Sequence, residues 1–167
     1  MYFQFIPQAV LNFGTQIFGP VGIEPDKLYD IGTIDIGRLK KAVMKDEKAS
    51  IPKWLSGALS EAKRKYENTK DPGIIDMIMD KAHLAHLREI VSLNESTFLK
   101  DLYRAEVDLY NIRTFIRIEA KKLGKDKLVL AIAEGGTKSP SFYIDLSGSS
   151  NEEIISSFKN TPYGKCI

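Results

Sequence analysis

The chain has 167 residues, and its 24 Lys and Arg nearly balance its 22 Asp and Glu, so the formal net charge at pH 7 is only +2. One domain of this length can bury a core without cross-links. Basic and acidic residues alternate along the chain, which excludes the clustered basic face of a nucleic-acid-binding protein. The lone cysteine, Cys166, excludes an internal disulfide and cysteine-rich zinc sites, and it indicates a reducing compartment.

The first 23 residues carry no charged side chain. Proline, glycine and glutamine interrupt their apolar character, so this head is not expected to span a membrane. It also lacks the basic start of a signal peptide. We expect residues 1–23 to form an irregular or short helical segment on a core, or a truncation edge, followed by one helical domain over residues 24–167.

Three long amphipathic helices are predicted after the head. Over about residues 52–68, apolar residues recur with the 3.6-residue period. The second helix, about 72–93, follows the candidate cap Asp71 and is apolar on more than one side, which predicts neighbours on more than one side. The third, about 97–123, is expected to end at a left-handed Gly124.

Shorter pieces follow these helices. Residues 125–133 suit a short helix, residues 134–137 a turn, and Ser139-Pro140 a helix boundary. Ser150 and Glu153 form a capping-box pattern that predicts one more short helix. No convincing alternating strands occur. The predicted fold class is therefore all-α, a packed helical repeat with long antiparallel helices and shorter capped ones.

Two histidines of the second predicted helix are candidate metal ligands. His83 and His86 are three residues apart, with Asp80 and Glu89 three residues beyond them on either side. A helical di-metal site takes ligands from several helices, and no other predicted helix carries a histidine. A surface or interface pair of histidines is the preferred interpretation, and we predict no metal and no cofactor.

Nucleotide binding and nucleophilic catalysis have equally weak signals. The stretch Gly135-Gly136-Thr137-Lys138-Ser139 lacks the spacing of a phosphate-binding loop and follows no predicted strand, so a plain turn is expected. The chain contains no G-x-S-x-G pattern, and Cys166 lies at a terminus that is expected to fray. We predict no catalytic residue.

Four polar residues are interleaved with apolar ones in the third long helix. Such a set can be catalytic in principle, but buried charges are usually paired and hydrogen-bonded. We therefore predict a structural polar network that fixes the register of this helix. Its members are Glu106, Asp108, Asn111 and Arg113.

Several stretches of the chain resemble the C subunit of V-type and archaeal-type rotary ATPases, the counterpart of vacuolar subunit d. They are Asp71-Pro72-Gly73-Ile74-Ile75-Asp76, Asp80-Lys81-Ala82, residues 103–114 and Gly124-Lys125-Asp126, with flanking agreement at 28–35 and 160–164. The resemblance covers about residues 24–165. Its most specific part is the pattern E-h-D-h-x-N-h-R-T at 106–114, where h is apolar or aromatic.

The resemblance implies a non-catalytic part of a rotor. Members of that family are similar to a funnel of three helical repeats that sits on the membrane rotor ring, receives the foot of the central shaft and transmits torque. The implied partners are the central-shaft subunits and the rotor ring, and the implied location is the cytoplasmic face of the membrane. The assembly would couple ATP to proton or sodium transport.

The family chain is longer, so the resemblance implies about one central repeat without its flanking repeats. Missing repeats would expose apolar surface, which predicts self-association through the head and the helix at 97–123. The shaft contact is expected on the polar faces of residues 53–67 and 83–95. A free-standing all-α adaptor or regulatory domain stays open as the alternative function.

Overall fold

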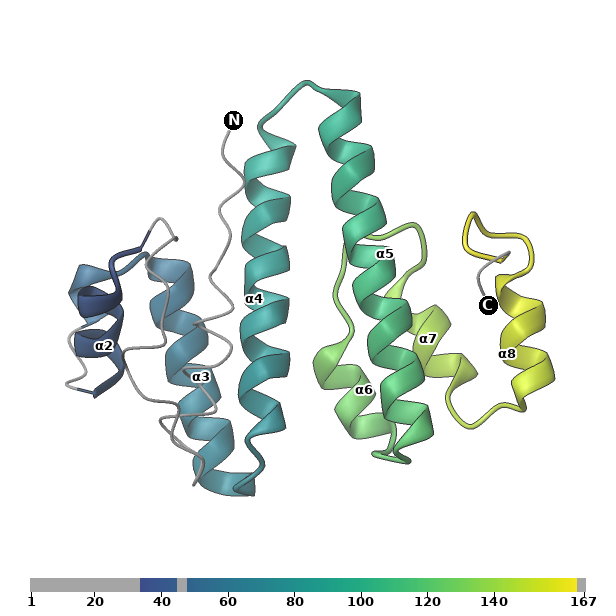
Figure 1. The fold of residues 1–167 in the computed structure, drawn as a ribbon, viewed down its shortest axis with the longest axis horizontal. Coiled ribbons are helices and arrows are strands. Elements are labelled where there is room, and N and C mark those ends of the chain that lie inside the picture. The colour runs from purple at the N-terminus through teal and green to yellow at the C-terminus, as the bar shows by residue number, and fades with distance from the viewer. Residues whose placement is uncertain (1–33, 45–47, 165–167) are drawn as a thin grey trace. The chain divides into compact units, whose positions relative to one another are not determined.

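The computed structural model describes residues 34–44 and 48–164 (Figure 1). Every element in these ranges is helical, and no strand occurs in them. The predicted all-α fold class is therefore confirmed. The chain divides into two compact units, residues 1–89 and 90–167. The head at 1–23 lies outside the described residues, so its predicted form stays a prediction. The prediction of one helical domain that starts at residue 24 is likewise untested.

The first unit is built around two long helices. Its elements are α2 (Ile36–Met44), the 3₁₀ turn η2 (Lys48–Ser50), α3 (Lys53–Thr69) and most of α4 (Gly73–Ser92). The bounds of α3 and α4 agree closely with the predicted ranges. Helix α3 buries Leu55, Ala58 and Ala62 along one face, as its apolar period predicts.

Helix α4 has the predicted start and the predicted broad burial. The backbone N–H of Gly73 donates a 3.0 Å hydrogen bond to Asp71 Oδ1, so Asp71 caps the first turn. A helix with one apolar stripe leaves its opposite face exposed. Helix α4 instead buries residues that are consecutive in sequence and therefore point to different sides of the helix. Its buried side chains are Ile74, Ile75, Met77, Ile78, Met79 and Leu84.

The second unit contains α5 (Thr97–Ala120), α6 (Lys125–Ala131), α7 (Pro140–Leu146) and α8 (Asn151–Phe158). The capping box of α8 is confirmed. Ser150 Oγ accepts from the Glu153 N–H at 3.3 Å, and Glu153 Oε2 accepts from the Ser150 N–H at 2.9 Å. Pro140 opens α7, where its missing N–H costs no helical hydrogen bond.

The C-terminal end of α5 differs from the prediction. The helix ends at Ala120, and the left-handed residue is Lys122, with φ 51°. Leu123 N–H donates to the Ile118 carbonyl at 3.1 Å and Lys122 N–H to the Glu119 carbonyl at 3.0 Å. These are the two bonds of a Schellman motif, and by satisfying the last carbonyls they offset the cost of a left-handed lysine.

The expected cap at Gly124 is therefore wrong. Gly124 has φ 88° and stands directly before α6 as its N-cap. A positive φ suits glycine, which has no Cβ to clash with the backbone. The prediction that Gly124 has a left-handed conformation is thus correct, but this glycine marks the start of α6 and not the end of α5.

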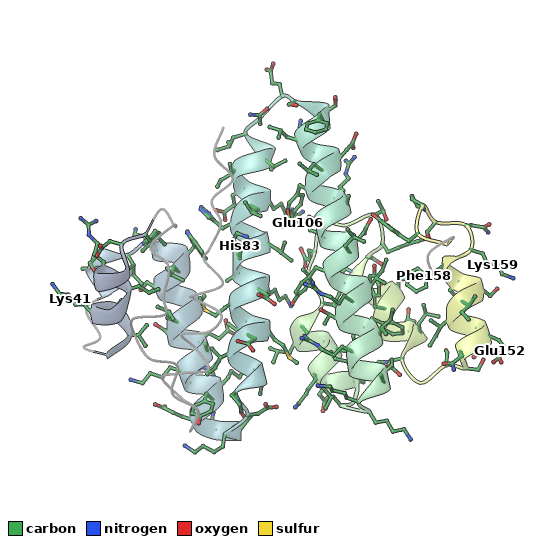
Figure 2. All side chains as sticks on the ribbon, viewed as in Figure 1. Lys41, His83, Glu106, Glu152, Phe158 and Lys159 are labelled. Atoms are coloured by element: carbon green, nitrogen blue, oxygen red, sulfur yellow. The ribbon has the colours of Figure 1, made fainter. Side chains whose placement is uncertain are left out.

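An aromatic cluster joins α5, α7 and α8. Tyr143 is 0% exposed, and Phe115 and Phe158 are each 1% exposed. The Tyr143 ring centroid lies 6.0 Å from that of Phe115 and 6.2 Å from that of Phe158. In Figures 1 and 2, α7 lies between α5 and α8, and Phe158 is on the side of α8 nearer to α7. Burying each such side chain contributes about 1.5–3 kcal/mol.

Candidate functional site

The four polar residues predicted on the long helix α5 divide into two buried and two exposed residues. Asp108 is 1% exposed and Asn111 is 0% exposed. Glu106 and Arg113 are exposed. Residues three apart on a helix share a side, which explains why Asp108 and Asn111 come together. The buried site therefore contains Asp108 and Asn111 and excludes Glu106 and Arg113.

Asn111 holds the backbone of the segment that follows α6. Its Nδ2 donates to the Ala133 carbonyl at 2.9 Å, and its Oδ1 accepts from the Ala133 N–H at 2.8 Å. The side-chain amide thus satisfies both backbone groups of one buried residue. A buried N–H or C=O needs such a partner, because leaving it unpaired costs about 1–3 kcal/mol.

Two tyrosines of α5 bind the same segment on either side of Ala133. Tyr110 donates its hydroxyl to the Ala131 carbonyl, and Tyr103 donates its hydroxyl to the Glu134 carbonyl, both at 3.2 Å. Residues 131–134 are therefore fixed to α5 by side-chain bonds to successive parts of their backbone. This segment has no regular secondary structure after Ala131, so these bonds take the place of a helix or sheet ladder.

Asp108 binds the next part of the segment and also the C-terminal turn. Its Oδ1 accepts from the Thr137 N–H at 2.7 Å. Its Oδ2 accepts from Thr137 Oγ1 at 2.7 Å and from the Tyr163 hydroxyl at 3.1 Å. A buried carboxylate requires partners of this kind, because an unpaired buried charge is costly. One side chain thereby joins three parts of the second unit.

The glycine pair before Thr137 allows this close approach. A Cβ on Gly136 would overlap Asp108 Oδ1, and a Cβ on Gly135 would lie 2.7 Å from the Tyr103 hydroxyl oxygen. Gly135 also has φ 106°, which favours glycine. The Thr137 N–H already donates to Asp108 Oδ1, so it is not free to act as a donor in a phosphate-binding loop. The segment is accordingly a bend that packs on α5, in agreement with the turn expected at 134–137.

The charge of Asp108 acts on two tyrosines. Burial, then the Asp108 charge and its hydrogen bond, raise the pKa of Tyr163 to about 12. Burial, then the charges of Asp108 and Tyr163, raise the pKa of Tyr143 still further above its ordinary range. Both phenols therefore stay protonated near neutral pH, as Tyr163 must in order to donate to Asp108. The Tyr143 hydroxyl is buried and has no hydrogen-bond partner in the described part of the chain.

This arrangement is one long helix whose buried polar side chains hold later segments of the chain in place. A family model described as ATP synthase (C/AC39) subunit matches residues 21–167, which include this whole arrangement. The chain belongs to this family. The resemblance to V-type and archaeal-type ATPase C subunits is thereby confirmed. Comparisons with curated proteins and with solved structures give no match.

In this member of the C/AC39 family, the histidine pair lies on α4 in the first unit, where Figure 2 labels His83. The His86 ring stacks on Trp54 of α3, with centroids 4.7 Å apart and an interplanar angle of 17°. His86 Nδ1 lies 3.6 Å from Glu89 Oε2. Burial and the neighbouring His86 lower the pKa of His83. The His86 ring thus helps to join α3 and α4.

No group of three or more His, Cys, Asp and Glu side chains in residues 34–44 and 48–164 is arranged to hold a metal ion. No helix in them is both long enough and apolar enough to cross a membrane.

Several residues of the site were not predicted from the sequence. They are Tyr103, Tyr110, Thr137 and Tyr163. The two tyrosines of α5 had a signal, because they lie within one or two turns of Asp108 and Asn111 on the same predicted helix. Thr137 had a weaker signal in the preceding glycines. Tyr163 lies in the stretch 160–164 that resembles the family, but no local pattern relates it to a partner 55 residues earlier.

Glu119, near the end of α5, makes a second contact of the same kind. Its Oε1 accepts from Ser147 Oγ at 2.7 Å, and its Oε2 accepts from the Gly148 N–H at 3.1 Å. These bonds fix the turn between α7 and α8 to α5. Two carboxylates of α5 therefore hold later turns of the second unit: Asp108 near the middle of the helix and Glu119 near its end.

Proposed function

We propose that this chain is a non-catalytic subunit of the central stalk of a V-type or A-type rotary ATPase, where it connects the central shaft to the membrane rotor ring and transmits torque. The observation that carries the proposal is membership of the C/AC39 family over residues 21–167. ATP hydrolysis and ion transport would belong to other subunits of the assembly. The transported ion would be a proton or sodium.

The long helix α5 suits torque transmission. Its 24 residues make a rod of about 36 Å at a rise of about 1.5 Å per residue. A subunit that carries torque must resist sliding of its segments past each other. Apolar contacts permit some sliding, whereas a buried hydrogen bond that breaks leaves unpaired groups at a cost of about 1–3 kcal/mol each.

The polar site supports a structural role for the same reason. Asp108 and Asn111 use their side-chain atoms to hold Thr137, Tyr163 and Ala133 in the second unit. Side-chain groups that are already hydrogen-bonded inside the fold can make it rigid, but they are not free to take part in a reaction. We propose that they keep the segments after α5 fixed when the neighbouring subunits turn.

The proposed location is the cytoplasmic face of the membrane, where the rotor ring would hold the subunit. The shaft contact is proposed on the polar faces of residues 53–67 and 83–95. Both ranges contain exposed charged residues, among them Lys53, Glu61 and Arg88.

A coupling experiment tests the torque proposal. Membranes that carry the rotary ATPase are depleted of this chain, and ATP hydrolysis and ATP-driven ion uptake are both measured. We expect ion uptake to be lost while hydrolysis by the catalytic head continues, and added chain to restore uptake. Uptake that is unaffected by depletion would contradict the proposal and favour a free-standing all-α adaptor.

A further inference from the structure

One hydroxyl in the core of the second unit has no hydrogen-bond partner. The side chain of Tyr143 is 0% exposed, and none of the described residues forms a hydrogen bond with its hydroxyl oxygen. Native proteins contain few groups of this kind, because burying an unpaired polar group is costly. Tyr143 therefore carries a spare hydrogen-bond donor inside the fold.

The Asp108 carboxylate lies close to this spare donor. Asp108 and Phe115 are seven residues apart on α5, so they lie within about 20° of each other around the helix. The Tyr143 ring packs on Phe115, with centroids 6.0 Å apart. Burial, then the charges of Asp108 and Tyr163, raise the pKa of Tyr143, as expected for a hydroxyl near the bond between those two residues.

Asp108 depends on a donor from a distant turn. In the described residues it accepts three hydrogen bonds from neutral groups, namely the N–H and hydroxyl of Thr137 and the hydroxyl of Tyr163. Thr137 belongs to the bend that packs directly on α5, whereas Tyr163 belongs to the turn after α8. Because a buried carboxylate is costly when it lacks donors, loss of the Tyr163 hydroxyl would leave Asp108 in need of a replacement.

We propose that Asp108, Tyr163 and Tyr143 form a latch on the turn after α8. In the closed state, Tyr163 donates to Asp108 and Tyr143 has no acceptor. In the open state the turn has left α5, and the Tyr143 hydroxyl replaces the Tyr163 hydroxyl on Asp108 Oδ2. The carboxylate keeps three donors in both states, so the turn opens without leaving a buried charge short of partners. This inference goes beyond the proposed rotary ATPase role and does not depend on it.

The aromatic cluster couples the turn to the Tyr143 ring. Phe158 is the last residue of α8, and its carbonyl accepts from the N–H of Thr161 at 2.9 Å and from the hydroxyl of Thr161 at 2.7 Å. The Phe158 ring centroid lies 6.2 Å from that of Tyr143. Movement of the turn therefore also loosens a ring that borders Tyr143, and this gives the Tyr143 hydroxyl room to shift toward Asp108.

Hydrogen exchange at single amides tests the latch. The N–H groups of Thr161 and Gly164 report on the turn, because both donate within it. The Ala133 N–H, which donates to Asn111 on α5, is the reference for the rest of the second unit. Exchange is followed by NMR in the full chain, and circular dichroism checks that each variant is folded.

The two tyrosines should have opposite effects on the turn. Tyr163→Phe removes the donor of the closed state, so Thr161 and Gly164 should exchange about tenfold faster relative to Ala133. Tyr143→Phe removes the donor of the open state, so the same two amides should exchange about tenfold more slowly relative to Ala133. Tyr66→Phe, which removes a hydroxyl from α3 in the first unit, is the matched control and should change neither ratio.

A merely structural role for Tyr143 gives a different result. If Tyr143→Phe only stabilised the fold, Ala133 would slow by the same factor as Thr161 and Gly164, and that outcome would overturn the proposal. Turn amides that exchange at the wild-type rate or faster in Tyr143→Phe would also overturn it. A second measurement is the Tyr143 hydroxyl proton in Tyr163→Phe, which should give a slowly exchanging NMR signal because it is bonded to Asp108, and its absence would contradict the latch.

Discussion

Asp108 and Tyr163 are 55 residues apart in the sequence, and the Tyr163 hydroxyl donates to Asp108 Oδ2 over 3.1 Å. The same carboxylate accepts two hydrogen bonds from Thr137. One buried side chain of α5 therefore holds both the bend between α6 and α7 and the turn after α8. This relationship makes the second unit dependent on a polar contact as well as on its aromatic cluster.

Removing the carboxylate should destabilise the second unit. Asp108→Ala leaves the Thr137 N–H and the Tyr163 hydroxyl without their acceptor. We expect the free energy of unfolding to fall by about 3 kcal/mol, because hydrogen bonds to a charged group contribute about 1.5–3 kcal/mol each and the donors stay partly buried. Urea unfolding followed by circular dichroism measures this loss.

Asp145→Ala is the matched control for that substitution. Asp145 lies at an exposed position of α7, where a change is expected to alter stability by no more than about 0.5 kcal/mol. Equal effects of the two substitutions would show that Asp108 does not hold the unit together.

A methyl group should be tolerated at one glycine and harmful at another. Gly136→Ala places its Cβ against Asp108 Oδ1 and is expected to cost about 1–3 kcal/mol. Gly57→Ala lies at an exposed position inside α3 with no atom within 4 Å of the new Cβ, so it should stabilise by up to about 1 kcal/mol. Thermal unfolding of the two variants provides the comparison, and opposite shifts are the expected result.

The Tyr143 hydroxyl should be dispensable. It is buried and has no hydrogen-bond partner in the described residues, so its removal breaks no hydrogen bond among them. Tyr143→Phe keeps the ring contacts with Phe115 and Phe158 and should leave stability unchanged or raise it by up to about 1 kcal/mol. A loss of more than 1 kcal/mol by the same urea measurement would mean that the hydroxyl makes a stabilising contact.

Tyr163 should make the protein sensitive to alkaline pH. Its pKa is raised from 10.0 to about 12 in the fold, so the folded state holds the phenolic proton more tightly than the unfolded chain does. The resulting stability is fully present below pH 10 and is lost as the pH rises toward 12. Tyr163→Phe should weaken this pH dependence. Parallel curves for the two proteins between pH 9.5 and 11 would refute this role for Tyr163.

His83 should make the protein sensitive to acidic pH in the opposite direction. Burial and His86 lower its pKa below the ordinary value of 6.5, so the unfolded chain binds this proton more readily than the folded chain. Stability is then full above pH 6.5 and falls as the pH drops below that value. His83→Gln should flatten the slope below pH 6.5, whereas His86→Gln should retain the part caused by burial.

The sequence predicted the long helices well because their signals are local. The apolar period of α3, the cap at Asp71 and the Ser150–Glu153 box all act within one or two turns of a helix. The end of α5 was wrong by a few residues because a Schellman motif can place a lysine, here Lys122, in the left-handed position. The rule that a helix ends at a left-handed glycine cannot detect that exception.

The polar site was only partly visible in the sequence. The helical period alone could have separated Asp108 and Asn111 from Glu106 and Arg113, because it sets which residues share a side. It could not show which side is buried, since apolar residues occupy both. The partners Thr137 and Tyr163 depend on the path of the chain after α5, which no local pattern contains.

The proposal that this C/AC39 family member is a stalk subunit can be tested by its binding to the central shaft. The chain is mixed with the shaft subunit from the same source and analysed by size-exclusion chromatography with light scattering. A shaft that lacks its foot serves as the control. We predict a defined complex with the intact shaft and none with the shortened one. A well-folded chain that elutes separately from the intact shaft would contradict the claim.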